Sequence, residues 1–200
     1  MGINLLHRKE RLILTTIDII DELGIQKLTT REIAKRQGVS EATIFRHFEN
    51  KNELLLAVLD YFTQFDADML QTTKLRNFKP LEALQYLITS YAEYYENYPA
   101  ITSILQLFDV LRYEPDLSEK VIKIQTDRTA MFSHLVKEAM NAGEISKEVD
   151  CDTMAVMILG LFRELCFNWK ISNCSFSLKE RSQVALKMLL DAFHTNTNVP

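Results

Sequence analysis

The sequence predicts an all-α protein, with a three-helix helix-turn-helix module at the N-terminus and a larger helical domain behind it. Glycine and proline together number nine of the 200 residues. No alternating apolar run bounded by turns predicts a strand. Apolar residues recur instead at helical spacing in most of the long segments between the few helix breakers, so about nine helices are expected.

The expected helices are separated by residues that end or begin helices. Glycine ends a helix readily because it adopts left-handed backbone angles, and proline suits only the first turn. Gly24, Gly38 and Gly143 should each end a helix, and Pro80, Pro99 and Pro115 should separate others. The predicted helices cover residues 5–23, 30–37, 41–48, 51–71, 80–98, 100–112, 116–142, 152–171 and 178–194.

Capping residues mark three helix starts close together near the N-terminus. Thr29 is a good N-cap, and Glu32 stands three residues on, where it completes a capping box. Gly38 ends that helix, Ser40 caps the next, and Asn50 caps the long helix that follows. Two short helices joined by Gly-Val-Ser predict a helix-turn-helix. The chain then divides into a DNA-binding domain, 1–50, and an effector-binding and dimerisation domain, 51–200.

The helix expected over 41–48 has one face for the core and one for a partner. With Ile44 as the buried anchor, the residues on the buried side are Glu41 and Phe48. Those on the opposite side are Ala42, Thr43 and Arg46, and those on the flanks are Phe45 and His47. Methyl groups can contact thymine, a hydroxyl can bond either type of base, and arginine can donate two hydrogen bonds to guanine, so this face can read bases.

The charges of this region suit a phosphate backbone, although the whole chain carries a net charge of −4. Lys27 to Lys51 contains six Lys or Arg against three Glu, whereas the excess of acid lies after residue 53. These charges would orient the protein as it approaches DNA, because the phosphates repel the acidic C-terminal part and attract the basic N-terminal module. The residues predicted to contact DNA are Thr29, Thr30, Arg31, Ser40, Glu41, Ala42, Thr43, Phe45, Arg46, His47 and Lys51.

These residues carry a resemblance to a known family. The stretch Leu28 to Leu55 resembles the N-terminal module of TetR-family bacterial transcriptional regulators in its threonine cap, Ile-Ala pair, Gly-Val-Ser turn, His-Phe pair and Asn-Lys pair. The resemblance implies a double-stranded DNA operator read by a homodimer, and a small-molecule effector that releases a repressor. Phe45 departs from the family, which has a tyrosine there whose hydroxyl meets a phosphate.

Aromatic residues gather on the middle helices. Most should be core residues, but a mostly apolar cavity with a few hydroxyls would suit an apolar or amphipathic effector. Gln125 and Arg128 could meet a carboxylate or phosphate of that effector, and a surface salt bridge is the main alternative for Arg128. The proposed lining residues are Phe62, Phe65, Tyr91, Tyr95, Phe108, Gln125, Arg128, Thr129 and Phe132.

The last two predicted helices carry more apolar residues than a single face packed against the rest of the protomer would need. A four-helix bundle formed with a second copy would use the surplus, whereas the alternative is that both helices close a monomeric core. The residues proposed for the dimer interface are Met154, Ile158, Leu161, Leu165, Val184 and Met188.

Other function classes find little support in the sequence. No metal, phosphate-loop or nucleophile motif is present, so neither an enzyme nor a cofactor is expected. The odd number of cysteines, three, and the absence of a signal peptide or membrane span indicate the cytoplasm, without a membrane partner. The remaining alternative to a regulator is a helical adaptor whose helix-turn-helix is structural only.

Overall fold

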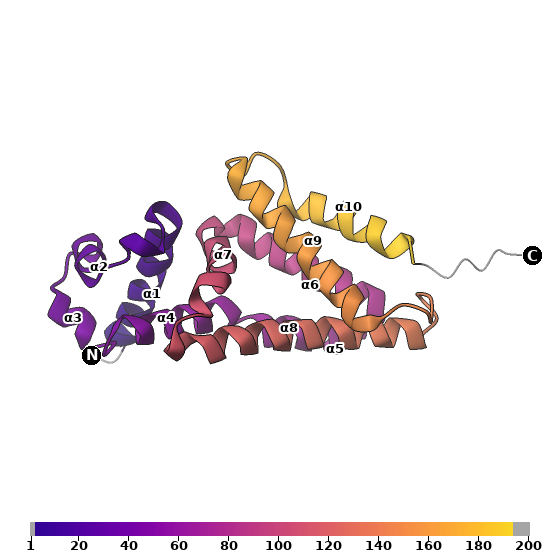
Figure 1. The fold of residues 1–200 in the computed structure, drawn as a ribbon, viewed down its shortest axis with the longest axis horizontal. Helices are drawn as coiled ribbons and strands as arrows, with labels where there is room; N and C mark the ends of the chain where they lie inside the picture. The colour runs from indigo at the N-terminus through magenta and orange to yellow at the C-terminus, as the bar shows by residue number, and fades with distance from the viewer. Residues whose placement is uncertain (1–2, 194–200) are drawn as a thin grey trace, which may run out of the picture. The chain divides into compact units, whose positions relative to one another are not determined.

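The computed structural model describes residues 3–193, and their side chains from Arg8 onward. The described residues form α-helices and two short 3-10 helices, without a strand (Figure 1). This confirms the all-α prediction. The helices are α1 (Ile3–Leu23), η1 (Ile25–Lys27), α2 (Thr30–Gln37), α3 (Glu41–Phe45), α4 (Lys51–Thr63), α5 (Asp66–Leu75), α6 (Pro80–Asn97), η2 (Pro99–Ile101), α7 (Thr102–Leu111), α8 (Pro115–Asn141), α9 (Cys151–Ile171) and α10 (Leu178–Asp191).

The chain packs as two compact units. Unit 1 contains the residues up to Gln64 together with Pro99–Ile124, and unit 2 contains Phe65–Tyr98 together with the residues from Gln125 onward. In unit 2, α10 packs on α6 and α9, and α5 packs on α6. Neither unit ends at residue 50, because α4, α7 and the start of α8 pack with the N-terminal helices. The functional division at residue 50 therefore remains a prediction.

Most of the expected caps are present. The Thr29 hydroxyl accepts a hydrogen bond from the backbone N–H of Glu32 at 3.1 Å, and the Asn50 side chain accepts one from Glu53 at 2.9 Å. Gly38 has a φ of 62°, the left-handed conformation that ends α2. Ser40 makes no capping hydrogen bond. Its hydroxyl lies 3.1 Å from that of Thr43 instead, so the prediction of a Ser40 side-chain cap was wrong.

The helix expected over 51–71 is two helices. α4 ends at Thr63, and α5 begins at Asp66. The Thr63 hydroxyl donates to the backbone oxygens of Leu59 and Asp60, and threonine bonds of this kind bend helices by competing with the backbone ladder. Asp66 then places a carboxylate in the first turn of α5, where the helix dipole favours negative charge. The long continuous helix was thus predicted wrongly.

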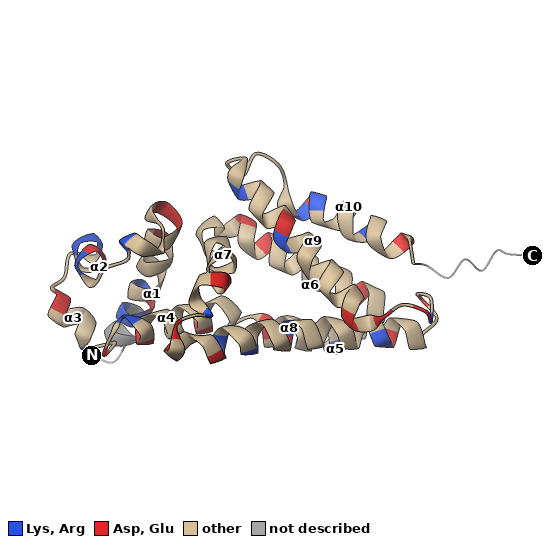
Figure 2. Ribbon diagram, viewed as in Figure 1, with Lys and Arg blue, Asp and Glu red and all other residues tan. Residues whose placement is uncertain are grey.

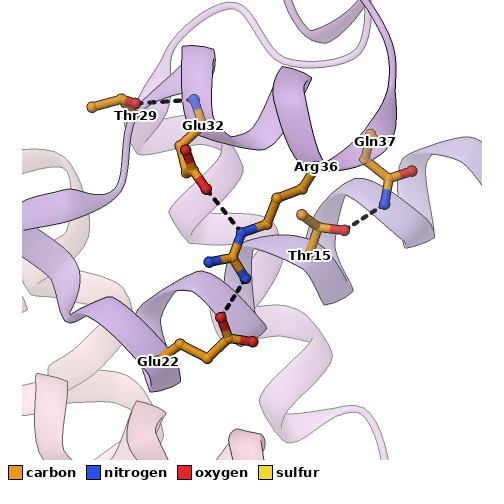
Figure 3. A network of polar contacts seen from close by, with 6 residues as sticks. All are labelled: Thr15, Glu22, Thr29, Glu32, Arg36 and Gln37. Atoms are coloured by element: carbon orange, nitrogen blue, oxygen red, sulfur yellow. Dashed lines mark hydrogen bonds and ion pairs between the residues drawn. The ribbon is translucent and has the colours of Figure 1, made fainter.

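An ion-pair network joins α2 to α1 inside unit 1 (Figure 3). The Arg36 guanidinium lies 2.7 Å from the carboxylate of Glu22 on α1 and 3.0 Å from that of Glu32 on α2. The hydrogen bonds that Arg36 donates to Glu32 and Glu22 raise the pKa of Arg36. The Gln37 amide also donates to the Thr15 hydroxyl at 2.5 Å. Two polar contacts from the last turn of α2 therefore orient it on α1.

The backbone of Gly38 gives a test of the turn. We expect Gly38→Ala to lower the free energy of unfolding by about 1 to 2 kcal/mol, because an L residue is strained at positive φ. No atom lies within 4 Å of the position that the added Cβ would take, so the loss would come from backbone strain alone. Urea denaturation measures it. Gly38→Asn is the control and should lose less, because asparagine tolerates this conformation; equal losses would contradict the strain argument.

Candidate DNA interface and effector site

The helix-turn-helix of unit 1 presents a short recognition helix. Ile44 and Phe48 are both buried, each with 1% of its surface exposed, and they attach the α3 segment to the module. Ala42 and Arg46 are exposed, as predicted for base-reading residues. The helix itself ends at Phe45, earlier than expected, and Arg46 and His47 continue as a turn.

Two residues of α3, Thr43 and Glu41, differ in exposure from the prediction. Thr43 was expected to point outward, but only 7% of its surface is exposed. The Arg46 guanidinium folds back and donates to the Thr43 hydroxyl at 3.3 Å, so it covers the residue that was expected to read bases beside it. Glu41 was expected on the buried side, but it is exposed and accepts a hydrogen bond from the Thr30 hydroxyl at 2.5 Å. The helical projection failed here because α3 is only five residues long.

His47 lies in positive surroundings beside the recognition helix. Burial lowers the pKa of His47, and the nearby charges of Arg46, Arg8 and Lys9 lower it further. The free protein therefore favours the neutral imidazole. The Lys9 ammonium lies 5.0 Å from the centre of the Phe48 ring, which brings the start of α1 to the same surface. A phosphate placed here would meet several cations at once.

The other predicted DNA contacts are available on the surface of unit 1. Lys51 is exposed at the first position of α4, where backbone N–H groups also favour an anion. Arg31 is exposed on α2, on which Figure 2 shows several Lys and Arg residues. Phe45 is 52% exposed, so its ring can pack beside a backbone that it cannot hydrogen-bond. Contact of any of these residues with DNA remains a prediction.

Unit 2 contains an open groove of about 410 Å³ between α5, the start of α6 and α8. Its apolar side chains include Leu70, Phe78, Ala83, Met131 and Leu135, and its polar ones include Lys74, Asn77, His134 and Glu138. A second hollow of about 460 Å³ lies beside Glu148 and Asp150, whose carboxylates would repel an anion. The groove beside α5 is therefore the better candidate for an amphipathic anion.

None of the predicted ligand residues lines that groove. Phe62 and Phe108 pack edge to face in unit 1, with ring centres 5.7 Å apart, whereas the other seven predicted residues belong to unit 2. Phe132 is fully buried, so it serves the core. Gln125 is exposed and donates to the Thr129 hydroxyl at 3.4 Å. The groove residues themselves carried no motif, and only the path of α5 after its break brings them together.

Arg128 forms a buried ion pair rather than a surface salt bridge. Its Nε and Nη2 donate to the two carboxylate oxygens of Asp66 at 2.8 and 3.0 Å. The side chains of Arg128 and Asp66 are only 11% and 21% exposed. The Arg128 guanidinium lies 5.1 Å from the centre of the Tyr91 ring, and Tyr91 belongs to a chain of ring contacts with Tyr95, Tyr94, Phe65 and Phe162. Sequence reasoning missed Asp66 because it was placed inside a continuous helix.

The proposed dimer residues separate into three groups by exposure. Met154 and Ile158 are each 1% exposed, so they belong to the core of unit 2 and offer no surface to a second copy. Leu161 and Leu165 are half-buried. Val184 and Met188, one turn apart on α10, are 60% and 69% exposed. Met154 and Ile158 were predicted wrongly because the sequence does not say which side of an apolar helix faces its own protomer.

A helix-turn-helix with an exposed arginine, followed by a helical body, defines a one-component DNA-binding regulator. Residues 12–58 match the family "Bacterial regulatory proteins, tetR family", and residues 49–192 match "YsiA-like protein, C-terminal region". The chain belongs to the TetR family of bacterial regulatory proteins and is a DNA-binding transcriptional regulator. The adaptor alternative is not favoured.

Several known regulators are similar over nearly their whole length. The fatty acid metabolism regulator protein of Bacillus subtilis is 23% identical over 179 residues, which cover 89% of this chain and 91% of that protein. The transcriptional repressor BepR of Brucella suis is 23% identical, with 96% and 94% covered. The structure of B. subtilis FadR with stearoyl-CoA is 22% identical, has a TM-score of 0.80, and covers 92% of this chain and 99% of that one.

Other site types were sought in the part of the chain that the structure describes. Residues 3–193 contain no group of three or more His, Cys, Asp or Glu that could hold a metal ion. None of the described helices is long and apolar enough to cross a membrane. Cys166 is buried, and burial raises the pKa of its thiol to about 12, so a reactive thiolate is not favoured there near neutral pH.

Two variants separate base reading from phosphate binding. Arg46→Ala should weaken binding to the operator by about 1 to 3 kcal/mol and relax the preference at one base position. Lys51→Ala should weaken binding to all sequences alike and reduce the slope of log affinity against log salt by about one unit. Fluorescence anisotropy with operator and scrambled duplexes measures both effects. Equal losses on the two duplexes for Arg46→Ala would remove Arg46 from base reading.

Proposed function

We propose that this protein is a homodimeric repressor that acts in the cytoplasm, has no enzymatic activity, and is released from its operator by the CoA thioester of a fatty acid. The groove of unit 2 is the observation that carries the proposal. Leu70, Met131 and Leu135 offer apolar surface for an acyl chain, while the Lys74 ammonium offers a cation for a phosphate. Its volume of about 410 Å³ lies within the usual range for ligand pockets.

The relatives support the same ligand class. The match over residues 49–192 covers the groove, and the B. subtilis FadR structure holds stearoyl-CoA. Thermus thermophilus FadR, described in complex with lauroyl-CoA, is 21% identical to this chain with a TM-score of 0.64, and 96% of this chain and 98% of that one are covered.

Release from DNA follows from the spacing of half-sites. A dimer that reads two half-sites needs its recognition helices one DNA turn, about 34 to 36 Å, or a multiple apart. An effector that binds the dimer more tightly in any other arrangement must lower operator affinity by the same coupling free energy. Release requires only that the effector binds another arrangement of the dimer more tightly than the arrangement that binds the operator.

Operator release tests the effector. Lauroyl-CoA should dissociate the protein from an operator duplex, whereas CoA alone should not, because CoA lacks the acyl chain that covers the apolar residues of the groove. Lys74→Glu should raise the lauroyl-CoA concentration needed for release by about fivefold, since it reverses an exposed charge beside the ligand. Lys137→Glu is the matched control, on α8 but outside the groove. Failure of lauroyl-CoA to release the wild type would overturn this effector class.

We place the dimer interface on the exposed apolar surface of α9 and α10. Phe167 and Ile171 on α9 are 42% and 65% exposed, and Val184 and Met188 on α10 are more than half exposed. Gly160 is exposed, and no atom lies within 4 Å of the position of an added Cβ, so a partner helix could approach closely there. Large exposed apolar residues grouped on two adjacent helices are typical of an interface between subunits.

A charge in this surface tests the interface. Met188→Glu should yield a folded monomer with operator affinity reduced by about 100-fold or more, because one recognition helix reads only one half-site. Sedimentation velocity and anisotropy measure the two effects. Ile122→Glu is the control, since Ile122 is 57% exposed on α8, and it should remain dimeric. A dimeric Met188→Glu variant would place the interface elsewhere.

A further inference from the structure

Lys9 lies on the face of α1 that packs into unit 1, although its ammonium reaches the surface. Ile13, Thr16 and Ile20 follow it at a spacing that places all four residues on one side of a helix. Those three are buried, with 9%, 0% and 4% of their surface exposed, whereas Lys9 is exposed one turn before Ile13. The Lys9 side chain is therefore directed toward the helices that pack on α1 rather than away from them.

The Lys9 ammonium lies against the aromatic ring that follows the recognition helix. Its Nζ is 5.0 Å from the centre of the Phe48 ring, and Phe48 is buried. The apolar stem of a lysine can cover such a ring while its charged end stays in water. Packing on Phe48 therefore holds the ammonium near His47, which precedes Phe48 in the chain and feels the charge of Lys9.

The charges around His47 are positive and lack a counter-ion. Arg46, Arg8 and Lys9 each lower the pKa of His47, and no carboxylate of the described residues contributes to the shift. None of the ion pairs in the described part of the chain includes Arg8 or Lys9, whereas Arg36 of the same unit is paired with two carboxylates. Like charges held together repel one another, and an anion from outside removes that repulsion. The cluster therefore favours a bound anion.

We infer that Lys9 and His47 together bind a phosphate of the DNA backbone, so that the DNA interface extends from the helix-turn-helix onto the start of α1. The anion is a DNA phosphate because the cluster borders the recognition helix of a DNA-binding regulator, and the backbone passes beside the groove that such a helix enters. Phosphate contacts fix the register of a protein on the duplex but carry no sequence information. Lys9 is thus a positioning contact. The inference concerns DNA binding alone and does not depend on the effector.

Removal of the charge at Lys9 tests the site on a scrambled duplex, so the operator sequence is not needed. Lys9→Met keeps an unbranched stem against Phe48 but loses the charge, and it should reduce the slope of log affinity against log salt by about one unit. At about 0.1 M salt its affinity should fall by about three- to tenfold. Lys9→Arg keeps the charge and should keep the slope. Fluorescence anisotropy over a range of salt concentrations measures these effects.

Arg11→Met is the matched control on the same helix. Arg11 is exposed and lies about 200° around α1 from Lys9, so its charge is directed away from the site. The variant should keep the wild-type slope. An equal loss of slope in Arg11→Met and Lys9→Met would show a general attraction to DNA and would overturn the site. A Lys9→Met variant with the wild-type slope would overturn it too, because Lys9 would then only pack on Phe48.

A second measurement uses the wild type, so it decides the matter even if Lys9→Met fails to fold. Acetic anhydride acetylates exposed lysines, and mass spectrometry reports the rate at each one. A saturating scrambled duplex should slow acetylation of Lys9 by about fivefold or more, because the ammonium is then paired with a phosphate. Lys137, exposed on α8, should react at the same rate with and without the duplex. Unchanged acetylation of Lys9 would mean that the DNA backbone does not reach the start of α1.

Discussion

The buried ion pair between Asp66 and Arg128 constrains the middle of this protein. Two charges removed from water are tolerated only when their geometry satisfies both, and loss of one partner typically destabilises a fold by about 3 to 5 kcal/mol. The bidentate contact therefore holds the start of α5 against α8 and sets the path of the helix that forms one wall of the groove. α4 and α5 are separate helices although no glycine or proline lies between them, and Asp66 is the first residue of the second.

The ion pair lies close to the two positions at which the chain passes into unit 2. Asp66 lies one residue after Phe65, where unit 2 begins, and Arg128 lies three residues after Gln125, where α8 enters the same unit. Of the helices that carry the pair, α8 is continuous from unit 1 into unit 2, whereas α5 begins in unit 2. Coupling between two sites needs an element whose arrangement both sites bias, so a coupling through this pair would have to involve α8.

The DNA-reading module depends on a different kind of contact. Arg36 joins α2 to α1 through two carboxylates, whereas Arg46 is held only by a single hydrogen bond to Thr43 at 3.3 Å (Figure 3 shows the Arg36 network). The scaffold is thus tied by several contacts, and the side chain predicted to read bases by one weak contact. If Arg46 reads a guanine as predicted, it gives up only this contact with Thr43.

Local chemistry was sufficient to predict the caps and the ends of most helices. Thr29, Gly38 and Asn50 act within four residues of their own positions, so their roles follow from residue type and spacing without knowledge of the fold. The helix-turn-helix, the exposure of Arg46 and the family followed from the same short stretch. The break after Thr63 and the partner of Arg128 did not, because Asp66 and Arg128 are 62 residues apart and nothing local relates them.

The sequence by itself thus determined the helical class, the order of the helices and the DNA-reading module, because helix propensity, capping and turn chemistry act over a few residues. Only the tertiary structure decided which apolar face each helix buries. Met154 and Ile158 lie in the core while Met188 is exposed, although all three belong to apolar helices. The groove and the ion pair were likewise decided by packing, since they join α5, α6 and α8 across long stretches of chain, and the energy of such contacts depends on proximity in space rather than in sequence.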